Sequence, residues 1–131
     1  MNLMTKYSRK YRNIYRIEKA DDPTTGAFSV SEAMNHYLPD PHFDADWPEG
    51  RDVYSGEYFG APTKKAMKRW VVDAHKLASR GLVVRRYRIP SEYVVASKIQ
   101  CVFPLDKAEK IGEYSVIEFC KRASKKGKNN A

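Results

Sequence analysis

The chain has 131 residues, 42% of them hydrophobic and 31% charged, and carries a formal net charge of +8. This length suits one domain, and its nine Tyr, five Phe and two Trp exceed the aromatic content typical of disordered chains. No run approaches the roughly 18 apolar residues of a membrane span, and the N-terminus lacks the apolar stretch of a signal peptide. We therefore expect a folded protein with no membrane partner, located in the cytoplasm.

The charges are segregated along the chain. Residues 1–19 carry a balance of +5, residues 20–60 a balance of −8, and residues 61–131 a balance of +11. A basic excess of this size favours a polyanionic partner, whereas the acidic block would repel it. The pattern therefore predicts two contact surfaces of opposite sign, although charge runs are also common on surfaces that contact only solvent.

The N-terminal half contains three predicted elements. Residues 11–18 alternate Tyr11, Tyr15 and Ile17 with charged residues, which predicts a strand. After the turn-like DDPTTG, Ser29 and Glu32 have the spacing of a capping box and predict a helix through about residue 37. Residues 38–52 contain three prolines and predict a long loop, with Phe43 and Trp47 as its anchors to the core.

A long amphipathic helix is predicted from Thr63 to Arg80, between Pro62 and Gly81. Its apolar arc contains Ala66, Met67, Trp70, Val71, Ala74, Leu77 and Ala78, with His75 at the border as a structural histidine. The opposite arc is a predicted basic stripe, formed by Lys65, Lys68, Arg69, Lys76 and Arg80.

Period-two patterns after Gly81 predict strands at residues 82–89, 93–96, 98–103 and 114–119, with one helical turn within residues 105–112. The order of elements favours an α+β fold, a mostly antiparallel sheet with one long amphipathic helix packed on it and a short N-terminal helix. We expect a single domain over residues 1–120 and a basic, disordered tail over residues 121–131. Cys101 and Cys120 lie in apolar segments and are expected to be buried thiols.

The predicted partner-binding residues come from both charged regions. Arg85, Arg86 and Arg88 follow the helix directly, so they and the helix stripe are expected to form one basic surface suited to phosphates. Asp44 and Asp46 lie in the acidic loop and represent the second surface. No recognised nucleic-acid-binding motif is present.

The same loop contains His36, His42, Asp40, Asp44 and Asp46, residue types that bind divalent metals. Their spacing matches no known ligand motif, and surface loops commonly contain such residues. We therefore expect no metal site. No nucleophile with a partnering base is evident either.

Tyr15-Arg16 on the first strand, and Tyr58-Phe59-Gly60 leading into the helix, resemble the layout of small ADP-ribosyltransferase-like domains, including the RES type. The resemblance implies an NAD-using enzyme. Apart from this alternative, we expect no cofactor. The resemblance assigns the phosphates of NAD to Arg16, the nicotinamide side to Ser55 or Tyr58, and the ribose to Gln100 or Glu118. The chain has no STS triplet and no ExE or QxE motif.

The sequence also resembles short phage-encoded accessory proteins, for which the expected cytoplasm would be that of the host. We expect a non-enzymatic binding protein, a phage or mobile-element accessory factor that inhibits or modulates a host protein or nucleoprotein complex. The alternatives are the ADP-ribosyltransferase-like enzyme and a nucleic-acid-binding module. Oligomeric state is left open.

Overall fold

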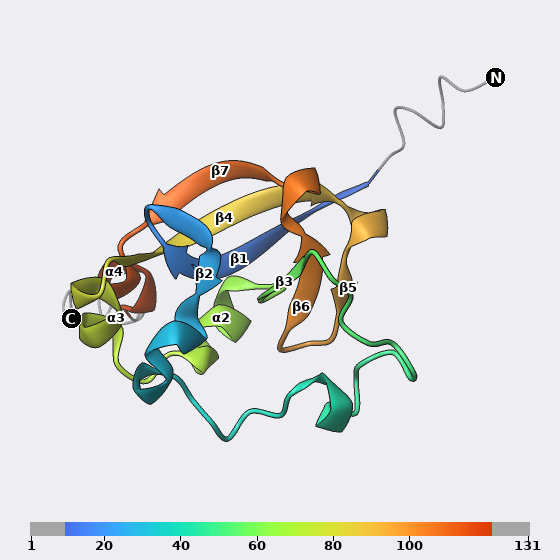
Figure 1. Ribbon diagram of the computed structural model, residues 1–131, viewed down its shortest axis with the longest axis horizontal. Helices are drawn as coiled ribbons and strands as arrows, with labels where there is room; N and C mark the ends of the chain where they lie inside the picture. The colour runs from blue at the N-terminus through green and yellow to red at the C-terminus, as the bar shows by residue number, and fades with distance from the viewer. Residues whose placement is uncertain (1–9, 122–131) are drawn as a thin grey trace, which may run out of the picture.

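The computed structural model describes residues 10–121, apart from the side chain of His42. Its fold is α+β, with two mostly antiparallel sheets and several short helices (Figure 1). The strands are β1 (Tyr11–Lys19), β2 (Asp22–Gly26), β3 (Glu57–Gly60), β4 (Leu82–Pro90), β5 (Val95–Ala96), β6 (Cys101–Pro104) and β7 (Glu109–Tyr114). The helices are α2 (Lys64–Trp70), α3 (Ala74–Ser79) and α4 (Val116–Cys120), with 3-10 turns η1 (Ala27–Ala33), η2 (Pro41–Phe43), η3 (Ser91–Tyr93) and η4 (Leu105–Lys107).

The larger sheet has the strand order β2-β1-β4-β7, and the smaller has the order β3-β6-β5. Figure 1 shows α3 and α4 near one end of the larger sheet and the smaller sheet near its other end. The strand β1 contributes side chains to two separate cores, because its side chains alternate between its two faces. Ile17 packs in a core with α2, α3 and α4, while Ile14 packs with Cys101 and Phe103 of β6.

The two sheets are joined through the main chain at Tyr15 and Ala61. The Tyr15 N–H donates to the Ala61 carbonyl at 2.9 Å, and the Ala61 N–H donates to the Tyr15 carbonyl at 2.7 Å. Only glycine fits beside this contact, because a Cβ at position 60 would lie 2.6 Å from the Tyr15 carbonyl oxygen. This contact fixes β3 beside β1.

The long helix predicted over residues 63–80 is wrong: the chain forms two short helices, α2 and α3, with a break at residues 71–73. The N–H groups of Val72 and Asp73 leave the helix to donate to the Ala33 carbonyl, at 2.8 and 3.1 Å. Asp73 then caps α3 by accepting from the Lys76 N–H. Val71 and Val72 are β-branched, which lowers the cost of leaving the helix here.

Four shorter predictions also need correction. The segment DDPTTG forms β2, and the helix predicted after Ser29 is the 3-10 turn η1, whose N-cap is Gly26. Most of the strand predicted at residues 114–119 is α4, capped by Ser115. The helical turn predicted within residues 105–112 is confirmed as the 3-10 turn η4, and β7 follows it. In the acidic loop Trp47 is buried as predicted, whereas Phe43 is 80% exposed and does not anchor the loop.

Within residues 10–121, no helix has the length and apolar character needed to cross a membrane. Residues 122–131, most of the predicted basic tail, lie outside the described residues.

Candidate functional site

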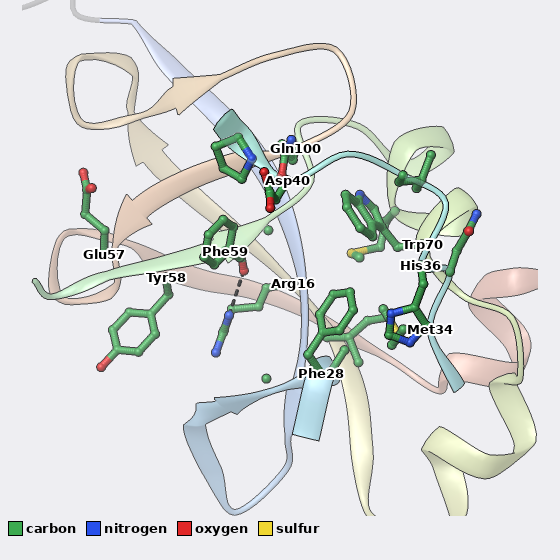
Figure 2. Close-up of a pocket in the computed structure, with 18 of the residues that line it drawn as sticks. Arg16, Phe28, Met34, His36, Asp40, Glu57, Tyr58, Phe59, Trp70 and Gln100 are labelled. Carbon is green, nitrogen blue, oxygen red and sulfur yellow. Dashed lines mark hydrogen bonds between the residues drawn. The ribbon is translucent and has the colours of Figure 1, made fainter. Parts of the chain in front are cut away.

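A pocket of about 600 Å³ opens beside β1, between the β2–η1 segment, the chain from residue 34 to 41, β3 and α2 (Figure 2). Its lining combines an aromatic and aliphatic wall with a few polar groups. The aromatic residues are Phe28, His36, Tyr58, Phe59 and Trp70, and the polar ones include Thr24, Arg16, Asn35, Asp40, Glu57 and Gln100. A cavity of this size and mixed chemistry is typical of small-molecule sites.

Arg16 projects from β1 and is only 5% exposed. Its Nε donates to a Glu18 carboxylate oxygen at 2.9 Å, Nη1 to the Phe59 carbonyl at 2.7 Å, and Nη2 to the Pro23 carbonyl at 3.1 Å. The guanidinium is therefore held by β1, β2 and β3 together, 5.1 Å from the centre of the Tyr58 ring. Since arginine has five N–H donors, each terminal nitrogen keeps one N–H that no described residue accepts.

Glu18, which is completely buried, anchors this arrangement. Its second oxygen accepts from Arg85 Nη1 at 2.9 Å and from the Tyr87 hydroxyl at 2.5 Å. Burial, and then the hydrogen bond to this carboxylate, raise the pKa of Tyr87 above its ordinary range. Burial alone would lower the pKa of Arg85, but the hydrogen bonds to Glu18 and Glu113 outweigh it, so the pKa is raised.

Phe28, His36 and Trp70 form an aromatic wall on the other side of Arg16 from Tyr58 (Figure 2). Phe28 meets both Trp70 and His36 edge to face, with ring centres 5.9 Å apart in each pair. Trp70 is fixed by donating its indole N–H to the Ile99 carbonyl at 2.7 Å. Phe28 itself is 51% exposed, so its ring can contact a ligand without being part of the closed core.

Gln100 forms the polar end of the pocket, near Asp40 (Figure 2). Its amide nitrogen donates to the Pro39 carbonyl at 3.0 Å and to an Asp44 carboxylate oxygen at 2.8 Å. Burial opposes ionisation of Asp44, yet the bonds from Gln100 and other donors prevail and lower its pKa. Gln100 thus attaches the acidic loop to the pocket.

The structure brings Arg16, Tyr58 and Gln100 together in this pocket, although they are far apart in sequence. The other two residues suggested by the resemblance are placed elsewhere: Ser55 lies in an exposed turn, and Glu118 is exposed and pairs with Lys121. Sequence reasoning missed Phe28 and Trp70 as pocket residues. Trp70 was predicted only as part of the apolar arc of the long helix, and no pattern marks Phe28, because the packing that unites the two rings is tertiary.

The predicted basic surface is divided. Arg85 is buried, donating to Glu18, Glu113 and the Ala20 carbonyl, so the prediction that it lies on that surface is wrong. Alternation along β4 is the reason: it turns Arg86 and Arg88 to the opposite face.

The helix residues of the stripe also differ from one another. Lys76 and Arg80 both pair with Glu32, and Lys68 donates to the Lys121 carbonyl. Lys65 and Arg69 are exposed and form no ion pair with any described residue. In the acidic loop Asp46 is exposed, whereas Asp44 is held by Gln100.

The candidate metal ligands whose side chains are described do not lie close enough together to form a site. No three His, Cys, Asp or Glu side chains among the described residues are placed to hold a metal ion. His36 is exposed and lies 2.7 Å from the Ser31 carbonyl, while the side chain of His42 is outside the described part. His75, expected at the border of the core, is exposed.

Fold and pocket together define a small α+β protein with a ligand-sized cavity beside the junction of two antiparallel sheets. Comparison with family models places the chain more narrowly. It belongs to the Bacteriophage T4 Y00F protein family, whose model matches residues 4–117. No curated protein and no solved structure matches it. The phage character expected from the sequence is confirmed, whereas this match gives no support to the ADP-ribosyltransferase resemblance.

Proposed function

We propose that this phage protein acts by binding, and that its pocket holds a small molecule with a planar ring and an anionic group, such as a nucleotide. One observation carries the proposal: a buried arginine with two uncommitted N–H donors faces a pocket with an aromatic wall. Guanidinium groups bind carboxylates and phosphates strongly, and aromatic side chains contact planar rings.

Gly26 supplies the space beside the guanidinium. A Cβ at this position would lie 3.2 Å from Arg16 Nη2 and 3.4 Å from Nη1. The backbone at Gly26, with φ of −94°, is accessible to any residue, so alanine can be introduced there without backbone strain. Gly26→Ala therefore obstructs the proposed anion site without removing Arg16, whose loss would leave Glu18 with one ion pair fewer.

The test is isothermal titration with NAD, ADP-ribose and ATP. We expect at least one to bind, and Gly26→Ala and Phe28→Ala each to weaken that binding about tenfold or more. Phe43→Ala is the matched control, because Phe43 is exposed and does not line the pocket. If no nucleotide binds, or if all three variants behave alike, the proposal is wrong.

NAD is a separate arm of the test, because Arg16, Tyr58 and Gln100, the residues that the resemblance relates to NAD, all line this pocket. Chromatography after incubation with NAD distinguishes binding from turnover: released nicotinamide would indicate the ADP-ribosyltransferase-like enzyme, whereas intact NAD agrees with a protein that only binds.

A second candidate function is modulation of a host protein or nucleoprotein complex through the charged surfaces. It is favoured by exposed charges of both signs that have no described partner, Lys65 and Arg69 on α2 and Asp46 in the acidic loop. Affinity purification of the tagged chain from host cells, with and without nuclease, tests it. If replacing Lys65 and Arg69 by Glu removes a partner from the purified material, this role is supported. If the same partners are recovered after the replacement, the role is contradicted.

A further inference from the structure

The first residues of β1 and the last residues of β4 leave one face of the larger sheet exposed (Figure 1). Asn13 pairs in register with Arg88, and Tyr15 with Arg86. Directly opposed residues in antiparallel strands point to the same face, and Tyr11 lies two residues from Asn13 on that face. Further along, the same face carries Ile17 and Val84 beneath the helices, so the open part begins where the helices end.

This open face has an aromatic character. Tyr11 is 46% exposed and stacks with Arg88, whose guanidinium carbon lies 4.1 Å from the ring centre. On β7, Tyr114 is 37% exposed and lies over Gly112, where a Cβ would come within 3.0 Å of its hydroxyl. Gly112 opposes Arg86 in register, so the second ring lies beside the second arginine.

The face is also basic, and neither Arg86 nor Arg88 forms an ion pair with any described residue. Arg86 makes no hydrogen bond or ion pair with any described residue, and its buried Nε has no partner. Its neighbour Arg85, on the opposite face, uses all three nitrogens internally. Lys64 extends the positive charge, lying over the Phe119 ring that contacts Tyr114. One acidic residue reduces this positive charge, because Glu109 is the register partner of Arg88.

We propose that this face, formed by Tyr11, Asn13, Arg86, Arg88 and Tyr114 with Lys64 at its border, binds single-stranded nucleic acid. Exposed tyrosines stack on unpaired bases, and arginines between them neutralise phosphates, which is how sheet surfaces bind single strands without strict sequence preference. A duplex hides its base faces and cannot use the rings. The inference does not depend on the pocket.

The test uses the full chain, a fluorescein-labelled 20-nucleotide oligothymidylate and a labelled 20-base-pair duplex, measured by fluorescence anisotropy. We expect the single strand to bind at least about fivefold tighter than the duplex. Tyr11→Val, which keeps strand propensity but removes the ring, should weaken binding about tenfold. Arg88→Ala should weaken it and reduce the slope of log K against log salt by about 0.7.

Lys98→Ala is the charge control, because Lys98 is exposed in the turn between β5 and β6, away from this face. Lys98→Ala should change affinity less than about twofold, a limit that includes the general effect of removing one positive charge. Absence of binding at low salt, equal binding of the duplex, or loss only on Arg69→Glu in α2 would each overturn the proposal. So would a protein partner that survives nuclease treatment and depends on Tyr11, since the face would then bind protein.

Discussion

The hydroxyl of Tyr87 donates to the carboxylate of Glu18 at 2.5 Å, inside the core. The same carboxylate holds Arg16 and Arg85, so one buried acid joins a phenol to two guanidinium groups. Breaking a buried pair leaves an uncompensated charge, which costs more than the pair contributes. The pocket arginine therefore depends on residues that never contact a ligand.

Tyr87→Phe removes one of the bonds to Glu18 while preserving the ring that packs on Phe103. We expect the free energy of unfolding to fall by about 2 kcal/mol, the usual loss for a hydrogen bond to a charged group. Urea unfolding measures it. Tyr93→Phe is the control, because no described residue bonds to that hydroxyl, and a similar loss in both variants would contradict the expectation.

Tyr87 also predicts a dependence on alkaline pH. Its pKa is raised in the folded chain above the ordinary value of 10.0, so the unfolded chain releases this proton first. The stability it contributes is present below pH 10 and is lost as pH rises further, by about 1.4 kcal/mol at pH 11. Wild type should therefore lose more stability than Tyr87→Phe between pH 9 and 11. Parallel curves would show that Tyr87 does not titrate as described.

Gly60→Ala should destabilise the protein by about 2 kcal/mol, because the added Cβ would meet the Tyr15 carbonyl at 2.6 Å and force the two sheets apart. Gly26→Ala is the control, since its Cβ would meet only the Arg16 side chain. Thermal unfolding of both variants decides the matter, and an unaffected Gly60→Ala protein would mean that the sheets tolerate separation.

The cysteines should differ in reactivity. Burial raises the pKa of Cys101 to about 12, and burial also raises the pKa of the half-buried Cys120. Because thiolate is the reactive form, a disulfide reagent at pH 8 should modify Cys120 slowly and Cys101 only after unfolding. Cys120→Ser should abolish the reaction of the folded chain. Rapid modification of Cys101 would show that its segment opens.

Asp73→Ala should cost about 1 kcal/mol, because Asp73 caps α3. Ser29→Ala should cost less than about 0.5 kcal/mol, since the Ser29 hydroxyl donates to the Gly26 carbonyl on the surface instead of capping a helix. Chemical denaturation compares the two. Equal losses would indicate that Ser29 has a structural role comparable to that of Asp73.

Local patterns predicted the strands β1 and β4 and the α+β class, because their signals extend over nine residues each. They did not predict that Arg16 and Glu18 are buried, because alternation places both on one face of β1 but does not show that β1 is covered on both faces at this point. The break near Val72 was also missed, since its cause is the Ala33 carbonyl, distant in sequence. The pocket could not be predicted for the same reason, because Arg16, Tyr58 and Gln100 are distant in sequence and meet only through the pairing of strands.

The register of β1 has an evolutionary consequence. Tyr11 and Asn13 belong to the open face, Ile14 to one core, Arg16 to the pocket and Ile17 to the other core. Inserting or deleting one residue in this strand would exchange its faces, placing the pocket arginine where Ile17 lies and a core residue at the pocket. Members of the family can therefore diverge by substitution along β1, whereas length changes should be confined to the segments that flank it.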